Sequence, residues 1–173
     1  FDAMDDLILF DFAIHWFDFL ASLTGNRLRT VHAMSATAPN QKARPPLLAQ
    51  VVVGLDQGQA SLIFDAATLH GHQDKTFVSG TLGSLSSNGP DLGQQQVTIS
   101  TAQGSAQPDL KGTWFNDGFR GAMGELLCSV EDNREPLHSA AGNLKSLELT
   151  FAALASARTG QTVKIGSQRR RTA

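Results

Sequence analysis

Residues 7–25 read LILFDFAIHWFDFLASLTG, and this stretch predicts the first element of the fold, a helix with one buried face. The apolar side chains that recur at spacings of three and four within residues 14–23 are Ile14, Phe17, Leu20 and Ala21. Gly25 follows them as a C-terminal stop. Beyond Gly25 the apolar period shortens towards two, which indicates that the chain continues as β-strands.

Six candidate strands follow one another without a helix between them. They are RTVHAMSAT (29–37), LLAQVVVGLD (47–56), QASLIFDAA (59–67), KTFVSGTLGSLSS (75–87), QQQVTIST (94–101) and SAQPDLKG (105–112). The second and third are joined by Gln57 and Gly58 and predict a hairpin. A last short strand is predicted at TVKIG (162–166).

Two helices are predicted after the strand run, over residues 116–133 and 139–160. The first has Phe119, Met123, Leu126, Leu127 and Val130 as its expected buried stripe, and Cys128 as a small buried thiol. The second has Leu144, Leu147, Phe151 and Leu154 at the same period.

Helix, strand run and helices in this order predict an α+β fold. We expect one domain over residues 1–173, with an open, mainly antiparallel or mixed sheet of about six strands and helices packed on one face. The VVV and LIF triplets suggest that the other face is apolar. A large exposed apolar face is costly, so we expect a homo-oligomer formed through the open sheet face.

The composition restricts the partners and the compartment. The chain has 173 residues, 41% of them hydrophobic, and a formal net charge of −2, which gives no global attraction to nucleic acid or to an anionic membrane. No apolar run reaches the about 18 residues that span a bilayer, and no basic signal-peptide start is present. The single cysteine cannot form an internal disulfide. We therefore expect a cytoplasmic protein that binds neither nucleic acid nor membrane.

Asp11 and His15 are two ionisable residues inside the apolar stretch. Residues four apart on a helix share a face, so the Asp11 carboxylate could flank the His15 imidazole. Imidazole accepts a proton near neutral pH, and a nearby carboxylate orients it and raises its affinity for that proton. The spacing is also compatible with simpler roles, because an aspartate near a helix start often caps it and a histidine on an apolar helix is often a hydrogen-bonded core residue.

A metal site is not expected. His70 and His72 stand in an HGH triplet, which could contribute two zinc ligands, but no third ligand stands at a recognisable spacing. A solvated turn is the better interpretation of this triplet.

The stretch LFDFAIHWFDFLASLTG resembles the Asp-x-x-x-His segment of the Gfo/Idh/MocA oxidoreductases, with Asp11 and His15 in register. This family includes glucose-fructose oxidoreductase and inositol dehydrogenase. The resemblance continues through ASLIFDA (60–66), VSGTLGSL (78–85) and the segment 112–163, where GAMGELL, REPLHSAAGNLKSLEL and SARTGQTV are the more specific parts.

The resemblance implies that this chain is the family's C-terminal, substrate-binding and oligomerising domain, of the glucose-fructose oxidoreductase type. The parent would be an NAD- or NADP-dependent dehydrogenase of a sugar, cyclitol or related polyol. In it, His15 would take the hydroxyl proton while a hydride leaves for nicotinamide, and Asp11 would bind substrate hydroxyls or orient the imidazole.

The family's dinucleotide-binding Rossmann half has no counterpart in this sequence. No G-x-G-x-x-G follows a strand, and the family's Glu-Lys-Pro segment, whose lysine contributes to catalysis, is missing. We therefore expect no cofactor-binding residues here and no catalytic activity from the 173-residue chain alone.

Two departures from the family pattern affect the expected site. The glycines usual before the family's aspartate are replaced by DDLILF, and Ala13 stands where glycine is common. Both departures bear on the shape of the site and hence on the substrate. The alternatives to a dehydrogenase are a non-catalytic sensor or scaffold of the same family, and a structural dimerisation module.

Overall fold

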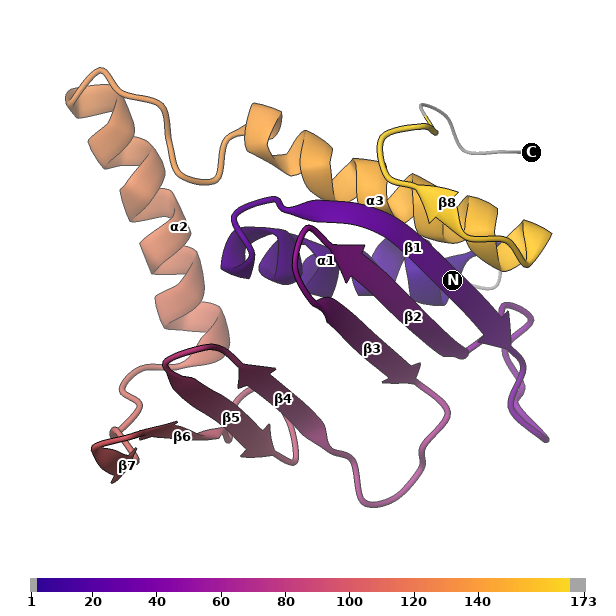
Figure 1. Cartoon of the computed structure of the whole chain (residues 1–173), viewed down its shortest axis with the longest axis horizontal. Helices are drawn as coiled ribbons and strands as arrows, with labels where there is room; N and C mark the ends of the chain where they lie inside the picture. The colour runs from indigo at the N-terminus through magenta and orange to yellow at the C-terminus, as the bar shows by residue number, and fades with distance from the viewer. Residues whose placement is uncertain (1–2, 169–173) are drawn as a thin grey trace. The chain divides into compact units, whose positions relative to one another are not determined.

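The computed structural model describes residues 3–168 (Figure 1), which form two compact units. Of the described residues, the first unit comprises 3–67 and 138–168, and the second comprises Thr68–Leu137. The α+β class with antiparallel sheets is confirmed. The strands form two sheets of four rather than one sheet of about six.

The sheet of the first unit has the strand order β3-β2-β1-β8, and every neighbouring pair is antiparallel. The strands are β1 (Leu28–Ala36), β2 (Leu48–Leu55), β3 (Gln59–Asp65) and β8 (Val163–Lys164). The predicted hairpin is present as β2 and β3, in which Val51 lies opposite Leu62. The alternation of buried and exposed residues along β2 gives this sheet one core face.

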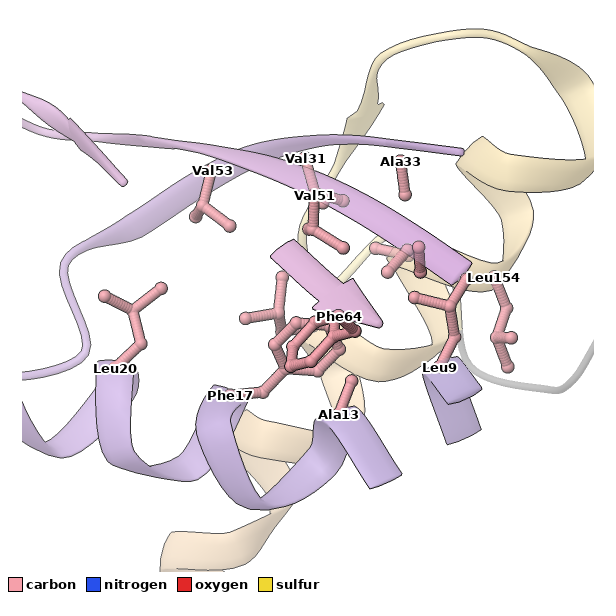
Figure 2. Packing of buried hydrophobic residues seen from close by; sticks show 14 of the residues in the cluster. Leu9, Ala13, Phe17, Leu20, Val31, Ala33, Val51, Val53, Phe64 and Leu154 are labelled. Carbon is pink, nitrogen blue, oxygen red and sulfur yellow. The ribbon is translucent and has the colours of Figure 1, made fainter. Parts of the chain in front are cut away.

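Three helical segments complete the first unit: the π-helix η1 (Leu7–Phe12), α1 (Ala13–Leu23) and α3 (Ala140–Thr159). Their buried side chains pack with Val31, Val51 and Val53 of the sheet in one hydrophobic core, part of which is drawn in Figure 2. Ala13, Phe17, Leu20 and Ala21 form the buried face of α1. The predicted first helix and its core face are therefore confirmed, except that Ile14 is only half-buried.

The buried face of α3 differs from the predicted stripe. Leu154 is buried as expected, Leu147 and Phe151 are half-buried, and Leu144 is exposed. The fully buried positions are mostly small or polar: Ser146, Thr150, Ala152, Ala153 and Ser156. Small residues let the helix approach the sheet closely, and the hydroxyl groups find partners there, as when Ser156 Oγ accepts from the backbone N–H of Ala33 at 2.9 Å.

The open face of the first sheet is mixed rather than continuously apolar. Met34, Val52 and Ile63 are exposed on it, and His32 and Ser61 lie opposite Val52 in the ladder. The VVV triplet divides its side chains between the faces, because Val51 and Val53 point into the core and Val52 does not.

The second unit holds the sheet β4-β5-β6-β7 and the helix α2 (Trp114–Glu131). Its strands are β4 (Asp74–Ser79), β5 (Gly83–Gly89), β6 (Gln96–Thr101) and β7 (Gly104–Ala106). The single strand predicted over 75–87 is a hairpin, since Ser79 pairs with Ser84. Gly83 is required at the start of β5, because a Cβ there would lie 2.2 Å from the carbonyl oxygen of Ser100.

The stripe of α2 that was predicted to be buried is exposed. Phe119, Met123, Leu126, Leu127 and Val130 are between 42% and 72% exposed. Cys128, expected to be buried, is also exposed. Within residues 68–137, all of which the structure describes, Ser129 is buried but no apolar side chain is.

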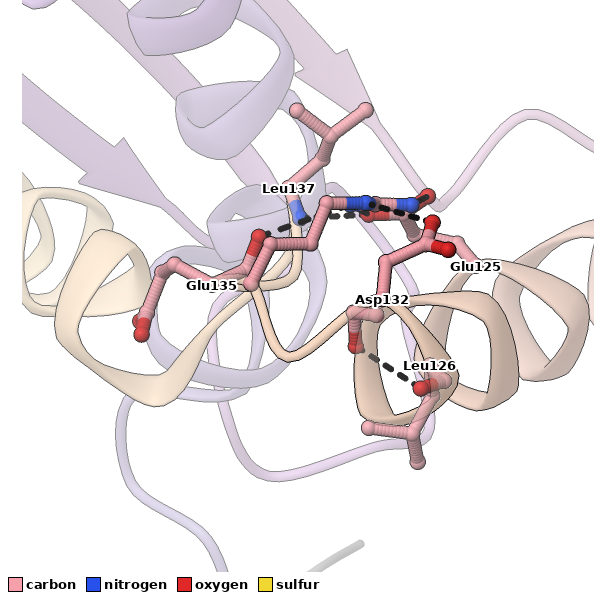
Figure 3. A network of polar contacts seen from close by, with 7 residues as sticks. Glu125, Leu126, Asp132, Glu135 and Leu137 are labelled. Atoms are coloured by element: carbon pink, nitrogen blue, oxygen red, sulfur yellow. Dashed lines mark hydrogen bonds and ion pairs between the residues drawn. The ribbon is translucent and has the colours of Figure 1, made fainter.

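The chain turns sharply after α2, and an ion pair fixes the turn (Figure 3). Arg134 donates to both oxygens of Glu125, at 2.7 and 3.0 Å, and the backbone N–H of Leu137 donates to Glu125 Oε1 at 2.8 Å. The hydrogen bonds to Glu125 raise the pKa of Arg134, so this guanidinium stays charged. No helix among the described residues is both long enough and apolar enough to cross a membrane.

Candidate functional site

The segment that carries Asp11 is a π-helix, a rare conformation that often marks functional sites. The backbone N–H of Ala13 donates to the carbonyl of Ile8, five residues earlier. This wider turn lets Ile8 and Leu9 reach the core together with Ala13 and Phe17 of the α-helix that follows. Because these apolar residues are buried, the position of Asp11 on the same segment is fixed, and its side chain is left exposed to solvent.

The start of η1 is held against the last turns of α3. Asp6, the N-cap residue, accepts backbone hydrogen bonds from Leu9 at 3.2 Å and Phe10 at 2.8 Å. Its carboxylate is 2.5 Å from Nη2 of Arg158. Phe10 also stacks on Phe151, with ring centroids 6.3 Å apart. The sequence analysis did not find this anchor, because no spacing rule connects positions 6 and 158.

His15 lies on the exposed side of α1, away from the buried residues Ala13 and Phe17. Its ring makes an edge contact with Trp16, at 6.2 Å between centroids. Trp16 is itself held by Phe12 at 4.6 Å and by Phe64 at 6.0 Å. The interpretation of His15 as a core histidine is therefore wrong: the imidazole is accessible and stands beside a fixed aromatic ring.

Asp11 is exposed within η1 and does not cap α1, whose N-cap is Phe12 without any side-chain cap bond. Within residues 3–168, the side chains of Asp11 and His15 share no hydrogen bond or ion pair. They lie one turn apart on consecutive helical segments and both face solvent. The carboxylate and the imidazole are therefore both exposed and do not form a preformed pair.

The described residues do not fit a dinucleotide site. Every strand pair in residues 3–168 is antiparallel, so the strand–helix–parallel strand unit with its glycine-rich phosphate turn is not formed there. The same residues hold no group of three histidine, cysteine or carboxylate side chains placed for a metal ion. His70 and His72 lie in the exposed loop between β3 and β4.

Two hollows have been identified, and neither is lined by Asp11 or His15. One of about 130 Å³ is lined by Arg29, Lys145 and Glu148 with apolar neighbours, and the hydrogen bond to Asp56 raises the pKa of Arg29 at its rim. The other, of about 500 Å³, is an open depression at the end of α2 that includes Val130 and Arg134.

Fold and site together define a class of protein: an α+β domain that covers one face of an antiparallel sheet with helices and presents a histidine from the first of them. Residues 4–165 match the family described as oxidoreductase family, C-terminal alpha/beta domain. The chain belongs to this Gfo/Idh/MocA family, and the resemblance inferred from the sequence is confirmed. A comparison with curated protein sequences finds no match.

Solved structures of oxidoreductases share the fold. An oxidoreductase from Agrobacterium radiobacter, in complex with NAD⁺, L-tartaric acid and magnesium, is 22% identical with a TM-score of 0.81 over 95% of this chain and 51% of that one. The aldose-aldose oxidoreductase from Caulobacter crescentus, with glycerol, is 19% identical with a TM-score of 0.71, covering 88% and 45% of the two chains.

The WlbA dehydrogenase from Bordetella pertussis, with NADH and UDP-GlcNAcA, is a further example. It is 18% identical with a TM-score of 0.68, over 90% of this chain and 44% of that one. The chain thus spans about half the length of the solved structures it matches.

Proposed function

We propose that this chain is the substrate-binding and oligomerising domain of an NAD(P)-dependent dehydrogenase that acts on a sugar, cyclitol or related polyol. The observation that carries the proposal is the exposed, unpaired imidazole of His15 on α1, one turn after Asp11, in a chain of this family. A core histidine or a capping aspartate would not be presented in this way.

His15 would serve as the general base. A secondary alcohol loses its hydroxyl proton and a hydride when it becomes a carbonyl, and a neutral imidazole accepts the proton near neutral pH. Asp11 would accept hydrogen bonds from neighbouring substrate hydroxyl groups, because an exposed carboxylate is an acceptor with several free lone pairs. Trp16, held by Phe12 and Phe64, would limit the positions that the imidazole can take.

Membership of the family supports the proposed substrate class and cofactor. Glycerol, L-tartaric acid and UDP-GlcNAcA accompany the three structures above, and all are hydroxylated molecules. NAD or NADP would bind outside the described residues, which lack a dinucleotide cradle, and the chain alone would be inactive. We assign no metal to the domain.

The remaining assignments are a single C-terminal domain over 1–173, a cytoplasmic location and a homo-oligomer. The open face of the first sheet supports the oligomer, since Met34, Val52 and Ile63 leave apolar surface on it. The polar neighbours His32 and Ser61 on the same face agree with a non-obligate interface, which is about as polar as ordinary surface.

The test is the activity of the full-length protein with a panel of polyols and both nicotinamide cofactors, for wild type and His15→Asn. We expect kcat to fall about 10²-fold or more in the variant, a size usual for loss of a general base. Added imidazole should restore part of the rate. His72→Asn is the matched control, because this histidine is also exposed but lies in the loop before β4.

Two results would redirect the assignment. Full-length protein that binds nucleotide but oxidises no polyol would favour the sensor or scaffold alternative. A stable oligomer that binds neither nucleotide nor polyol would favour the structural dimerisation module.

A further inference from the structure

Helix α2 presents a continuous apolar face that nothing covers within its own unit. Seen down an ideal helix at 100° per residue, Phe115, Phe119, Met123, Leu126 and Val130 fall on one side. Phe119 is 64% exposed and Val130 is 72% exposed. Leu127, 65% exposed, borders the same side. We call these six residues the α2 face.

The sequence of α2 gives the helix little stability of its own. Gly118, Gly121 and Gly124 lie inside it, and each interior glycine costs about 1 kcal/mol relative to alanine. An 18-residue helix without tertiary packing is marginal in water. Since residues 68–137 bury no apolar side chain, the stabilising contact must come from a surface that packs on the α2 face.

We propose that the α2 face binds the α2 face of a second copy of this chain, with the two helices antiparallel about a two-fold axis close to Met123. This inference goes beyond the proposed enzymatic function and does not depend on it. It also differs from the proposed contact through the open face of the first sheet.

The face is self-complementary under this symmetry. Its apolar residues extend about equally to both sides of Met123, so Phe115 of one copy reaches Val130 of the other, and Phe119 reaches the region of Leu126. An isologous interface requires such matching, because the same patch must meet itself in reverse.

The size of the face suits a stable dimer. The six residues offer on the order of 600 Å² of exposed side-chain surface, which approaches the about 800 Å² per partner of a standard interface. Aromatic side chains and methionine, which are enriched in such interfaces, make up three of the six.

Disulfide trapping tests the two-fold axis directly. A residue on such an axis lies beside its own copy, so Met123→Cys in a Cys128→Ser background should form a disulfide-linked dimer of the full-length protein under mild oxidation. Wild type is the matched control, because Cys128 is exposed but lies about 140° around the helix from Met123. Equal cross-linking of the two proteins, or none in either, would overturn the proposal.

Mass measurement tests the face without a cross-link. Phe119→Asp should halve the native mass of the full-length protein by light scattering, whereas Leu82→Asp, at a leucine of the β4–β5 turn that is 88% exposed, should leave it unchanged. An unchanged mass for Phe119→Asp would mean that another part of the polypeptide or another partner covers the α2 face, and this result would contradict the proposal.

Discussion

Ser146 Oγ of α3 donates a 2.6 Å hydrogen bond to Asp18 Oδ1 of α1 and so joins two helices that are far apart in the sequence. The serine is fully buried, whereas the aspartate is exposed. The bond therefore sits at the edge of the core, where α1 is oriented on α3. The orientation of α1 in turn decides where His15 is presented.

Ser146→Ala should lower the free energy of unfolding by about 1 kcal/mol. The change removes one hydrogen bond to a carboxylate, and the exposed Asp18 regains water as a partner, which limits the loss. Urea unfolding of the full-length protein measures it. Ser22→Ala, at an exposed position of α1, should change stability by less than about 0.5 kcal/mol. Equal effects of the two changes would show that the bond contributes nothing.

Phe17→Ala should cost about 3–5 kcal/mol of stability, the usual range for deleting a fully buried aromatic side chain. Phe17 is completely buried and meets Phe64 edge to face, with ring centroids 6.4 Å apart. Phe19→Ala is the matched control on the same helix, because Phe19 is 49% exposed and should cost under about 1 kcal/mol. Comparable midpoints in urea would disprove the placement of this core.

The sequence predicted the type of most elements because each carries a strong period. The helix over 14–23, the hairpin of β2 and β3, and the two later helices all lie within a few residues of their predicted positions. Periodicity identifies an apolar face, but it does not say what covers that face. For this reason Phe119 and Val130 were expected in a core that their own unit does not contain.

The candidate site was predictable in part. Asp11 and His15 were identified by spacing and resemblance, but their exposure was not, since an apolar stretch such as 7–25 looks buried throughout. The π-helical turn forms because Ile8 and Leu9 are buried in the core. The contact between Asp6 and Arg158 joins two residues that are far apart in the sequence and that only the fold brings together. Neither leaves a local signal in the sequence.

Arg158→Met should loosen η1 without unfolding the domain. Arg158 and Asp6 are only 30% and 17% exposed, so their ion pair is partly shielded from water and holds the start of the π-helix. We expect the backbone amides of residues 8–13 to exchange with deuterium about ten-fold faster, while those of β2 stay unchanged. Arg44→Met is the control, because the Arg44–Asp5 pair is 78% and 66% exposed and contributes little. Unchanged exchange in η1 would show that its apolar residues alone hold it.

Asp74→Asn should stabilise the β4–β5 hairpin increasingly as the pH rises. Burial raises the pKa of the Asp74 carboxyl and the charge of Asp91 raises it further, while the hydrogen bond from Gln95 opposes them. The folded state therefore binds more protons than the unfolded chain between the ordinary carboxyl pKa near 4 and the raised folded value. Stability falls as the pH rises through this window, and asparagine, which does not titrate, removes the fall.

The measurement is the ratio of wild-type to variant amide exchange at Thr76 and Val78, in which the intrinsic pH dependence of exchange cancels. The wild-type amides should become relatively faster to exchange as the pH rises above about 4, the ordinary carboxyl pKa. Asp109→Asn, at an exposed position outside the sheet, is the control and should give a ratio independent of pH. A flat ratio for Asp74→Asn would mean that its carboxyl titrates alike in the folded and unfolded chain.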